Sequence, residues 1–168
     1  MIDAILVIMT LVCLYTDLRY KKIYNVVLIP ALVMGLLLNT YKYGISGGLL
    51  SLKGFLLGIA LLFIPFALGG MGAGDVKLLG VIGSIKGPEF VFLVFLGAAL
   101  IGGAISVVVM IKQGNFIDRF KAIVFTFLSM LRIIPPVNLL KGKESINVAS
   151  FPYGVALAVG TFVAYLVR

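Results

Sequence analysis

Histidine is absent from the 168 residues, and cysteine occurs only once, as Cys13. Without histidine the chain cannot form a Ser-His-Asp triad, a Cys-His pair or an H-E-x-x-H zinc site. A single cysteine cannot form a disulfide framework or a four-cysteine zinc site within one chain. Charged residues are also scarce, at 12% of the chain, against about 25% in soluble proteins. The remainder is rich in apolar residues, 62% with a mean hydropathy of +1.21, which indicates a membrane protein.

The charge that is present is mostly positive. The chain has 14 Lys and Arg against 6 Asp and Glu, a formal net charge of +8. In a soluble protein this balance would suggest nucleic acid as a partner. Here the basic residues lie between apolar runs, so anionic lipid and membrane topology explain them better. We therefore expect the chain to meet a lipid bilayer and no nucleic acid.

The apolar runs predict an all-α, polytopic membrane protein with about six transmembrane helices. A span needs about 20 apolar residues. Five runs have close to this length: 2–18, 25–43, 49–68, 90–111 and 148–167. A shorter sixth run, 76–85, fits a helix whose end reaches into a watery cavity. No composition shift or linker divides the chain, so residues 1–168 are predicted to form a single membrane-embedded domain.

The long connection 112–147 contains another apolar segment, 122–140. Apolar residues from Ile117 to Leu131 recur there at three- and four-residue spacing, with charged residues elsewhere, so we predict a helix lying in the membrane interface. Pro135 and Pro136 would end this helix. If the segment spans the membrane instead, the last helix is inverted.

Basic residues on alternate sides of the predicted spans give the orientation. Ten lie on one side: Arg19, Lys21, Lys22, Lys77, Lys112, Arg119, Lys121, Arg132, Lys141 and Lys143. Four lie on the other: Lys42, Lys53, Lys86 and Arg168. By the positive-inside rule, the side with ten faces the cytoplasm.

Two of the acidic residues are candidates for chemistry. Asp17 closes the first predicted span and Asp75 precedes the fourth, so both lie on the cytoplasmic side and can meet. Taken alone, Asp17 is explained by a pair with Lys21 four residues on. Asp75, after Gly72-Ala73-Gly74, is explained alone as a helix cap. Together they favour a functional site, because an acid at mid-membrane costs about 2.5 to 3.5 kcal/mol on insertion scales.

Paired carboxylates suit one kind of hydrolysis. At about 4 Å two carboxylates repel by roughly 4 kcal/mol at an effective dielectric constant of 20, which separates their pKa values by about three units. One then holds a proton while the other is ionised. In an aspartic protease the ionised member takes a proton from water as the water attacks a peptide carbonyl, and the protonated member binds the carbonyl oxygen. The residues alone do not distinguish the acid from the base.

Three stretches resemble the type IV prepilin peptidases, membrane aspartyl proteases of the G-x-G-D class. Residues 17–25 are similar to the family's Asp followed by a basic loop and Ile-Pro-Asn, although Tyr24 stands where Pro is usual. Residues 72–78, GAGDVKL, look like the full G-x-G-D-x-K-L signature. Residues 151–156 are similar to the P-[YF]-G segment of the short peptidases of tight-adherence pili. For Pro152-Tyr153-Gly154 a plain helix start and an active-site wall remain equally open.

The resemblance implies that Asp17 and Asp75 are the catalytic residues. It implies cleavage of a short basic leader from prepilin-like precursors, at the cytoplasmic face of the inner membrane. The large members of the family also carry paired CxxC motifs and methylate the new N-terminus. Since Cys13 is the only cysteine and nothing precedes the first helix, we expect no methyltransferase activity, no metal and no cofactor.

Other functions remain open. Presenilin-like and signal-peptide-peptidase-like enzymes share G-x-G-D but lack the x-K-L continuation. A small transporter or proton pathway would also place acids on broken helices near the membrane. A catalytically silent partner in pilus assembly is the third alternative.

Overall fold

The computed structural model describes residues 2–67, 70–112 and 153–167, and these residues contain only helices and short connections. The helices are α1 (Ile2–Tyr20), α2 (Asn25–Ala67), α3 (Ala73–Lys86), α4 (Pro88–Lys112) and α6 (Tyr153–Val167). The predicted all-α class is therefore confirmed for this part of the chain. The predicted interfacial helix at 122–140 lies outside the described residues.

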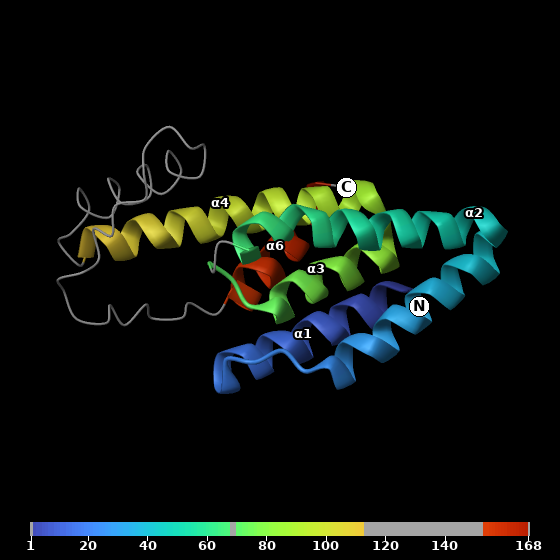
Figure 1. The fold of residues 1–168 in the computed structure, drawn as a ribbon, viewed down its shortest axis with the longest axis horizontal. Coiled ribbons are helices and arrows are strands. Elements are labelled where there is room, and N and C mark those ends of the chain that lie inside the picture. The colour runs from blue at the N-terminus through green and yellow to red at the C-terminus, as the bar shows by residue number, and fades with distance from the viewer. Residues whose placement is uncertain (1, 68–69, 113–152, 168) are drawn as a thin grey trace. The chain divides into compact units, whose positions relative to one another are not determined.

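Helix α2 is a hairpin with two arms. Gly44 has φ 63° and ψ −148°, a backbone conformation that glycine adopts without a steric penalty, and it separates arm 25–43 from arm 45–67. Figure 1 shows the second arm returning beside α3, which lies between this arm and α1. The two arms correspond to the predicted runs 25–43 and 49–68.

The second arm of α2 packs closely on α3 through glycines. A Cβ atom added to Gly54 would lie 2.0 Å from the carbonyl oxygen of Gly83, and one added to Gly83 would lie 2.1 Å from that of Gly54. One added to Gly58 would meet the carbonyl oxygen of Leu79 at 2.6 Å. Small residues allow this approach of two helix backbones, which is typical of membrane helices.

A buried asparagine joins both arms of α2 to the end of α3. The side-chain amide of Asn39 donates hydrogen bonds to Ser51 Oγ at 2.8 Å and to the carbonyl oxygens of Ser84 and Ile85, each at 3.1 Å. Asn39 is 3% exposed, so these bonds are shielded from solvent. The bonds hold one end of α3 against the hairpin.

The same end of α3 also contacts α1 and α6. Lys86 forms an ion pair with Asp3, and the Tyr165 hydroxyl donates to Asp3 Oδ1 at 2.9 Å. The Lys86 ammonium lies 4.9 Å from the centre of the Tyr165 ring, and Phe90 packs edge-on against that ring. These contacts fix three helices at the end remote from Asp17 and Asp75.

Two described helices, and not six, are long and apolar enough to cross a membrane: α2, and residues 88–108 of α4. The predicted count of six spans is thus not met by this part of the chain. Two helices are short for a span, since α3 has 14 residues and α6 has 15. Helix α1 carries three charged residues, Asp3, Asp17 and Arg19. The runs 25–43 and 49–68 both fall within α2 and so are counted once. Each arm of α2 has a length of about 28 Å or more at about 1.5 Å per residue, close to the thickness of the hydrocarbon core.

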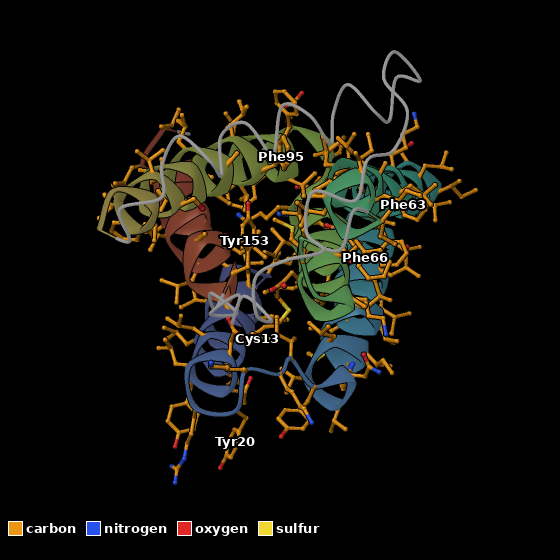
Figure 2. The ribbon with its side chains drawn as sticks, turned by 60° about the vertical axis from the view of Figure 1, so that its left-hand side comes forward. Cys13, Tyr20, Phe63, Phe66, Phe95 and Tyr153 are labelled. Carbon is orange, nitrogen blue, oxygen red and sulfur yellow. The ribbon has the colours of Figure 1, made fainter. Side chains whose placement is uncertain are left out.

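Many large apolar side chains lie on the outside of the helices. Phe63 and Phe66 point outward from α2 (Figure 2), and Val26, Ile45 and Leu100 are each at least three-quarters exposed. Such exposure is costly in water and favourable in lipid, so a membrane location is consistent with the surface as well as with the composition.

The chain divides into two compact units. The first comprises Met1–Gly102 and Pro152–Arg168, and the second Gly103–Phe151. The described part of the second unit is the final stretch of α4. The candidate site lies within the first unit.

Candidate active site

Asp17 lies in the last turn of α1, where the helix ends at a residue with left-handed backbone. Lys21 has φ 50° and donates its N–H to the carbonyl oxygen of Asp17 at 2.9 Å. This closing bond is typical of a helix C-terminus that ends in a left-handed residue, a position that glycine usually takes. The chain then turns away through residues 22–24, and the Asp17 side chain remains 6% exposed.

Asp75 lies in the first turn of α3 and helps to begin that helix. Its Oδ2 accepts a hydrogen bond from the Gly72 N–H at 3.2 Å, and its own N–H donates to the Gly72 carbonyl at 3.1 Å. These reciprocal bonds fix the carboxylate at the helix start. Gly74 lies against Ile23, since an added Cβ would be 3.0 Å from the Cβ of Ile23. The glycines thus bring the start of α3 close to the loop that follows α1.

Asp17 and Asp75 line the same pocket. Its volume is about 360 Å³, and the lining residues are Asp17, Lys21, Lys22, Ile23, Tyr24, Asn25, Gly72, Gly74 and Asp75. Figure 1 shows the end of α1 and the starts of α3 and α6 at the same end of the molecule. The structure therefore brings together the two acids that the sequence singled out, although they are 58 positions apart in the chain.

Burial and a neighbouring negative charge both raise the pKa of Asp75, which precedes the apolar run 76–85. Burial is the larger effect and the Asp17 carboxylate adds to it, so the pKa of Asp75 is raised to about 6. The hydrogen bond from Gly72 acts in the opposite direction. A carboxyl group with this pKa can hold a proton under conditions in which an exposed aspartate is ionised.

A hydrogen bond connects the two motif stretches of the pocket. Lys77 Nζ donates to Asn25 Oδ1 at 3.2 Å, although the two residues are 52 positions apart. Since Lys77 is on α3 and Asn25 begins α2, this bond holds the starts of the two helices near each other. Lys77 is thereby directed to Asn25 and not to Asp75.

A third segment reaches Asp17 from the far end of the chain. The Gly154 N–H, in the first turn of α6, donates to Asp17 Oδ2 at 2.8 Å in a buried contact. Figure 2 shows the neighbouring Tyr153 pointing from α6 toward the interior, whereas Tyr20 lies at the exposed end of α1. For Tyr153 and Gly154, the contact favours an active-site wall over a plain helix start. The sequence alone gave no signal that this amide meets Asp17.

No cluster of three or more His, Cys, Asp or Glu side chains that could hold a metal ion occurs within residues 2–67, 70–112 and 153–167. What the pocket does offer is two carboxylates, two lysines and the backbone of two glycines. Such a set can transfer protons and bind an extended peptide backbone.

Comparison with known proteins agrees with the resemblance. A family model described as the type IV leader peptidase family matches residues 4–107, a span that includes Asp17 and Asp75 and ends before α6. No curated protein and no solved structure matches the chain. The family match covers more than half of the 168 residues. The chain therefore belongs to the type IV leader peptidase family.

Proposed function

We propose that this protein is a membrane aspartyl endopeptidase in which Asp17 and Asp75 together activate water. The observation that carries the proposal is that both carboxylates line one pocket, supported on one side by the end of α1 and on the other by the start of α3. Both residues are more than nine-tenths buried, and the pocket that they line offers water and substrate a way to reach them. Buried acids facing each other are costly unless they have a function.

The proposed reaction uses one proton shared between the two acids. The ionised carboxylate takes a proton from a water molecule while the water oxygen bonds to the scissile carbonyl carbon. The protonated carboxyl group donates its hydrogen to the carbonyl oxygen. When the resulting gem-diol collapses, the C–N bond breaks and the leaving nitrogen takes a proton from the acid that received one from water. One hydroxyl of the diol returns its proton to the other acid, which restores the pair.

Backbone groups of the pocket suit an extended substrate. A peptide next to the bilayer needs hydrogen-bond partners for its own N–H and C=O groups. Gly72 and Gly74 line the pocket without side chains, so enzyme backbone can approach substrate backbone there. This supports a peptide as the substrate.

We propose a prepilin-like precursor with a short basic leader as that peptide, because the family is defined by leader peptidase activity. The pocket would then open at the cytoplasmic face of the inner membrane, the side to which ten of the 14 basic residues were assigned. In this arrangement α1, α3 and α6 lie within the bilayer beside α4 and the two arms of α2. With one cysteine, these 168 residues cannot supply paired CxxC motifs, so we propose peptidase activity without methyl transfer.

The test is direct cleavage. Purified protein in detergent is incubated with a candidate precursor, and the mass of the new N-terminal product is measured. Native protein should release the leader, whereas Asp17→Asn and Asp75→Asn should lower the rate by about 10³-fold or more, since paired catalytic groups act as a unit. Asp3→Asn is the matched control, because Asp3 lies on α1 at the end remote from the pocket.

Folding of each variant can be followed through Cys13. This is the only cysteine in the chain, and it is 1% exposed, so a thiol-reactive dye reports unfolding. Loss of cleavage with Cys13 still protected supports the proposal. Cleavage that survives loss of either acid rejects it. A proton pathway would instead show Asp-dependent proton flux in vesicles, and a silent assembly partner would leave every precursor uncut.

A further inference from the structure

We infer that Gly154 is a positioning residue that holds Asp17 as the ionised member of the acid pair, so that Asp17 is the base and Asp75 carries the proton. The inference rests on the proposed function and extends it, because it assigns the two roles. It starts from the hydrogen bond that the Gly154 N–H donates to Asp17 Oδ2 at 2.8 Å.

This amide is free to serve Asp17 because of its place in α6. Gly154 follows Tyr153, the first residue of the 15-residue helix, and the first N–H groups of a helix have no acceptor within it. They also form the positive end of the helix dipole, which favours a negative charge. Asp17 lies near the carboxyl end of its own helix, where the dipole disfavours its charge, so it depends on a donor from outside.

Only glycine leaves room for the contact. A Cβ atom added at position 154 would lie 2.5 Å from Asp17 Oδ2, 3.0 Å from its Cγ and 3.1 Å from its Cβ. All three atoms belong to the Asp17 side chain. Alanine at this position would therefore displace the carboxylate and weaken its bond to the amide, while the backbone of α6 has no such clash.

The support given to Asp75 is weaker. Its hydrogen bond from Gly72 is longer, at 3.2 Å, and only partly buried, whereas the Asp17 contact is buried. Asp75 lies at the start of its own helix, and Asp17 lies at the start of α6 but also at the end of α1. The dipoles therefore do not favour Asp17, and what favours its charge is the shorter, shielded bond from Gly154. Two neighbouring carboxylates do not both ionise readily, and the proton goes to the member whose charge is less stabilised.

Other ionisable groups near Asp17 come from each surrounding element. Cys13 precedes it on α1, Lys21 and Lys22 follow in the loop, Asp75 faces it from α3, and Tyr153 begins α6. The lysines line the pocket beside both acids and so do not distinguish them. The Gly154 amide donates to Asp17 and not to Asp75, so it is the group that stabilises the charge of one acid more than that of the other.

The first test is the pH dependence of cleavage in Gly154→Ala. Loss of the amide contact raises the pKa of Asp17, so the acidic limb of the kcat/KM profile should move to higher pH, with kcat lowered by about tenfold or more and KM nearly unchanged. Gly103→Ala is the control, because a Cβ at Gly103 meets nothing within 4 Å. A uniform loss of rate with the acidic limb in place would mean a merely structural role and would overturn the inference.

The second test uses the unaltered protein and so does not depend on a variant folding. Selective ¹³C-carbonyl tyrosine with ¹⁵N-glycine marks two amides by NMR, Gly44 and Gly154; the same scheme with methionine marks Gly35 and Gly72. The Gly154 amide should shift mainly in the lower-pH step of the titration, and the Gly72 amide mainly in the upper step. The Gly154 shift should lose its pH dependence in Asp17→Asn.

The outcomes separate the inference from the proposed function. If the reverse order of steps is observed, or if the Gly154 amide does not respond to pH, the assignment of the base is wrong while Asp-dependent cleavage can still stand. If either Asp→Asn variant cleaves normally, the proposed function itself fails, whichever amide titrates first.

Discussion

Gly54 and Gly83 lie face to face. A Cβ atom added to Gly54 would be 2.0 Å from the carbonyl oxygen of Gly83, and one added to Gly83 would be 2.1 Å from that of Gly54. This contact sets the distance between the second arm of α2 and α3. The helix held in this way, α3, is the one that carries Asp75 in its first turn.

Gly83→Ala should destabilise the protein strongly. The added methyl group meets backbone, which cannot turn aside as a flexible side chain can, so we expect a loss of about 3 kcal/mol or more in the free energy of unfolding. The unfolding temperature, followed by dye access to Cys13, measures it. Gly103→Ala, with open space around position 103, should be neutral or gain up to about 1 kcal/mol. Equal unfolding temperatures for the two variants would contradict the packing described.

Asn39→Ala should lower the free energy of unfolding by about 2 to 3 kcal/mol. The change removes three hydrogen bonds and leaves buried carbonyl oxygens of α3 without this donor. Thr40→Ala is a suitable neighbour for comparison, because the Thr40 hydroxyl is exposed and bonds only within its own helix, to the Leu36 carbonyl. Its effect should stay within about 0.5 kcal/mol. A similar loss in both variants would show that Asn39 does not connect the hairpin to α3.

Lys21→Gly should stabilise the end of α1 by up to about 1 kcal/mol. Lys21 has φ 50°, and glycine adopts this conformation without the steric cost that a side chain carries. Lys22→Gly provides the comparison, because Lys22 also lines the pocket but does not have positive φ. It should be neutral or destabilising. If Lys21→Gly is the less stable of the two, the Lys21 side chain contributes contacts that outweigh the backbone strain.

Asp75→Asn should unfold at a higher temperature than the native protein at pH 7, and this advantage should shrink toward pH 4. The pKa of Asp75 is raised from 3.8 to about 6 on folding, so between these pH values the folded state binds more protons than the unfolded state. Stability conferred by the acid is therefore lost as the pH rises through this window. Asparagine does not ionise and keeps an oxygen for the Gly72 amide.

The measurement is a series of unfolding temperatures at half-unit pH steps from 4 to 7, for both proteins in the same detergent. A constant difference across the series would mean that Asp75 is not protonated in the folded state. Asp3→Asn should instead lower the free energy of unfolding by about 1 kcal/mol or less, and the unfolding temperature slightly, because it leaves Lys86 without its carboxylate partner.

Apolar runs predicted where the helices lie but not how they end or bend. The predicted run 2–18 extends to Tyr20 because Lys21, a residue with no strong tendency to end a helix, takes left-handed backbone there. The predicted run 76–85 begins earlier, at Ala73, because Gly72 and Asp75 form reciprocal bonds that hydropathy does not record. The meeting of the two acids was predicted from the order of the apolar runs, and both acids line one pocket in the structure.

Contacts between distant segments were beyond the sequence. Glycine is frequent in the chain, with 20 residues, and a single sequence does not tell which glycine faces which. Gly54 opposite Gly83 and Gly154 against Asp17 both depend on the packing of whole helices. Gly44 shows the same limit, because the sequence places a boundary between runs 25–43 and 49–68 but does not tell that the chain reverses there into a hairpin.

The separation of Gly154 from Asp17 along the chain has a consequence for biosynthesis. The hairpin α2 and helix α3 are contiguous, so on the ribosome they are complete and can pack together once residue 86 has emerged. The amide that completes the surroundings of Asp17 is translated roughly 3 to 14 s after residue 86, at about 5 to 20 residues per second. A nascent chain would thus acquire its full set of acid-supporting contacts only after the helices that carry and brace Asp75 have been synthesised.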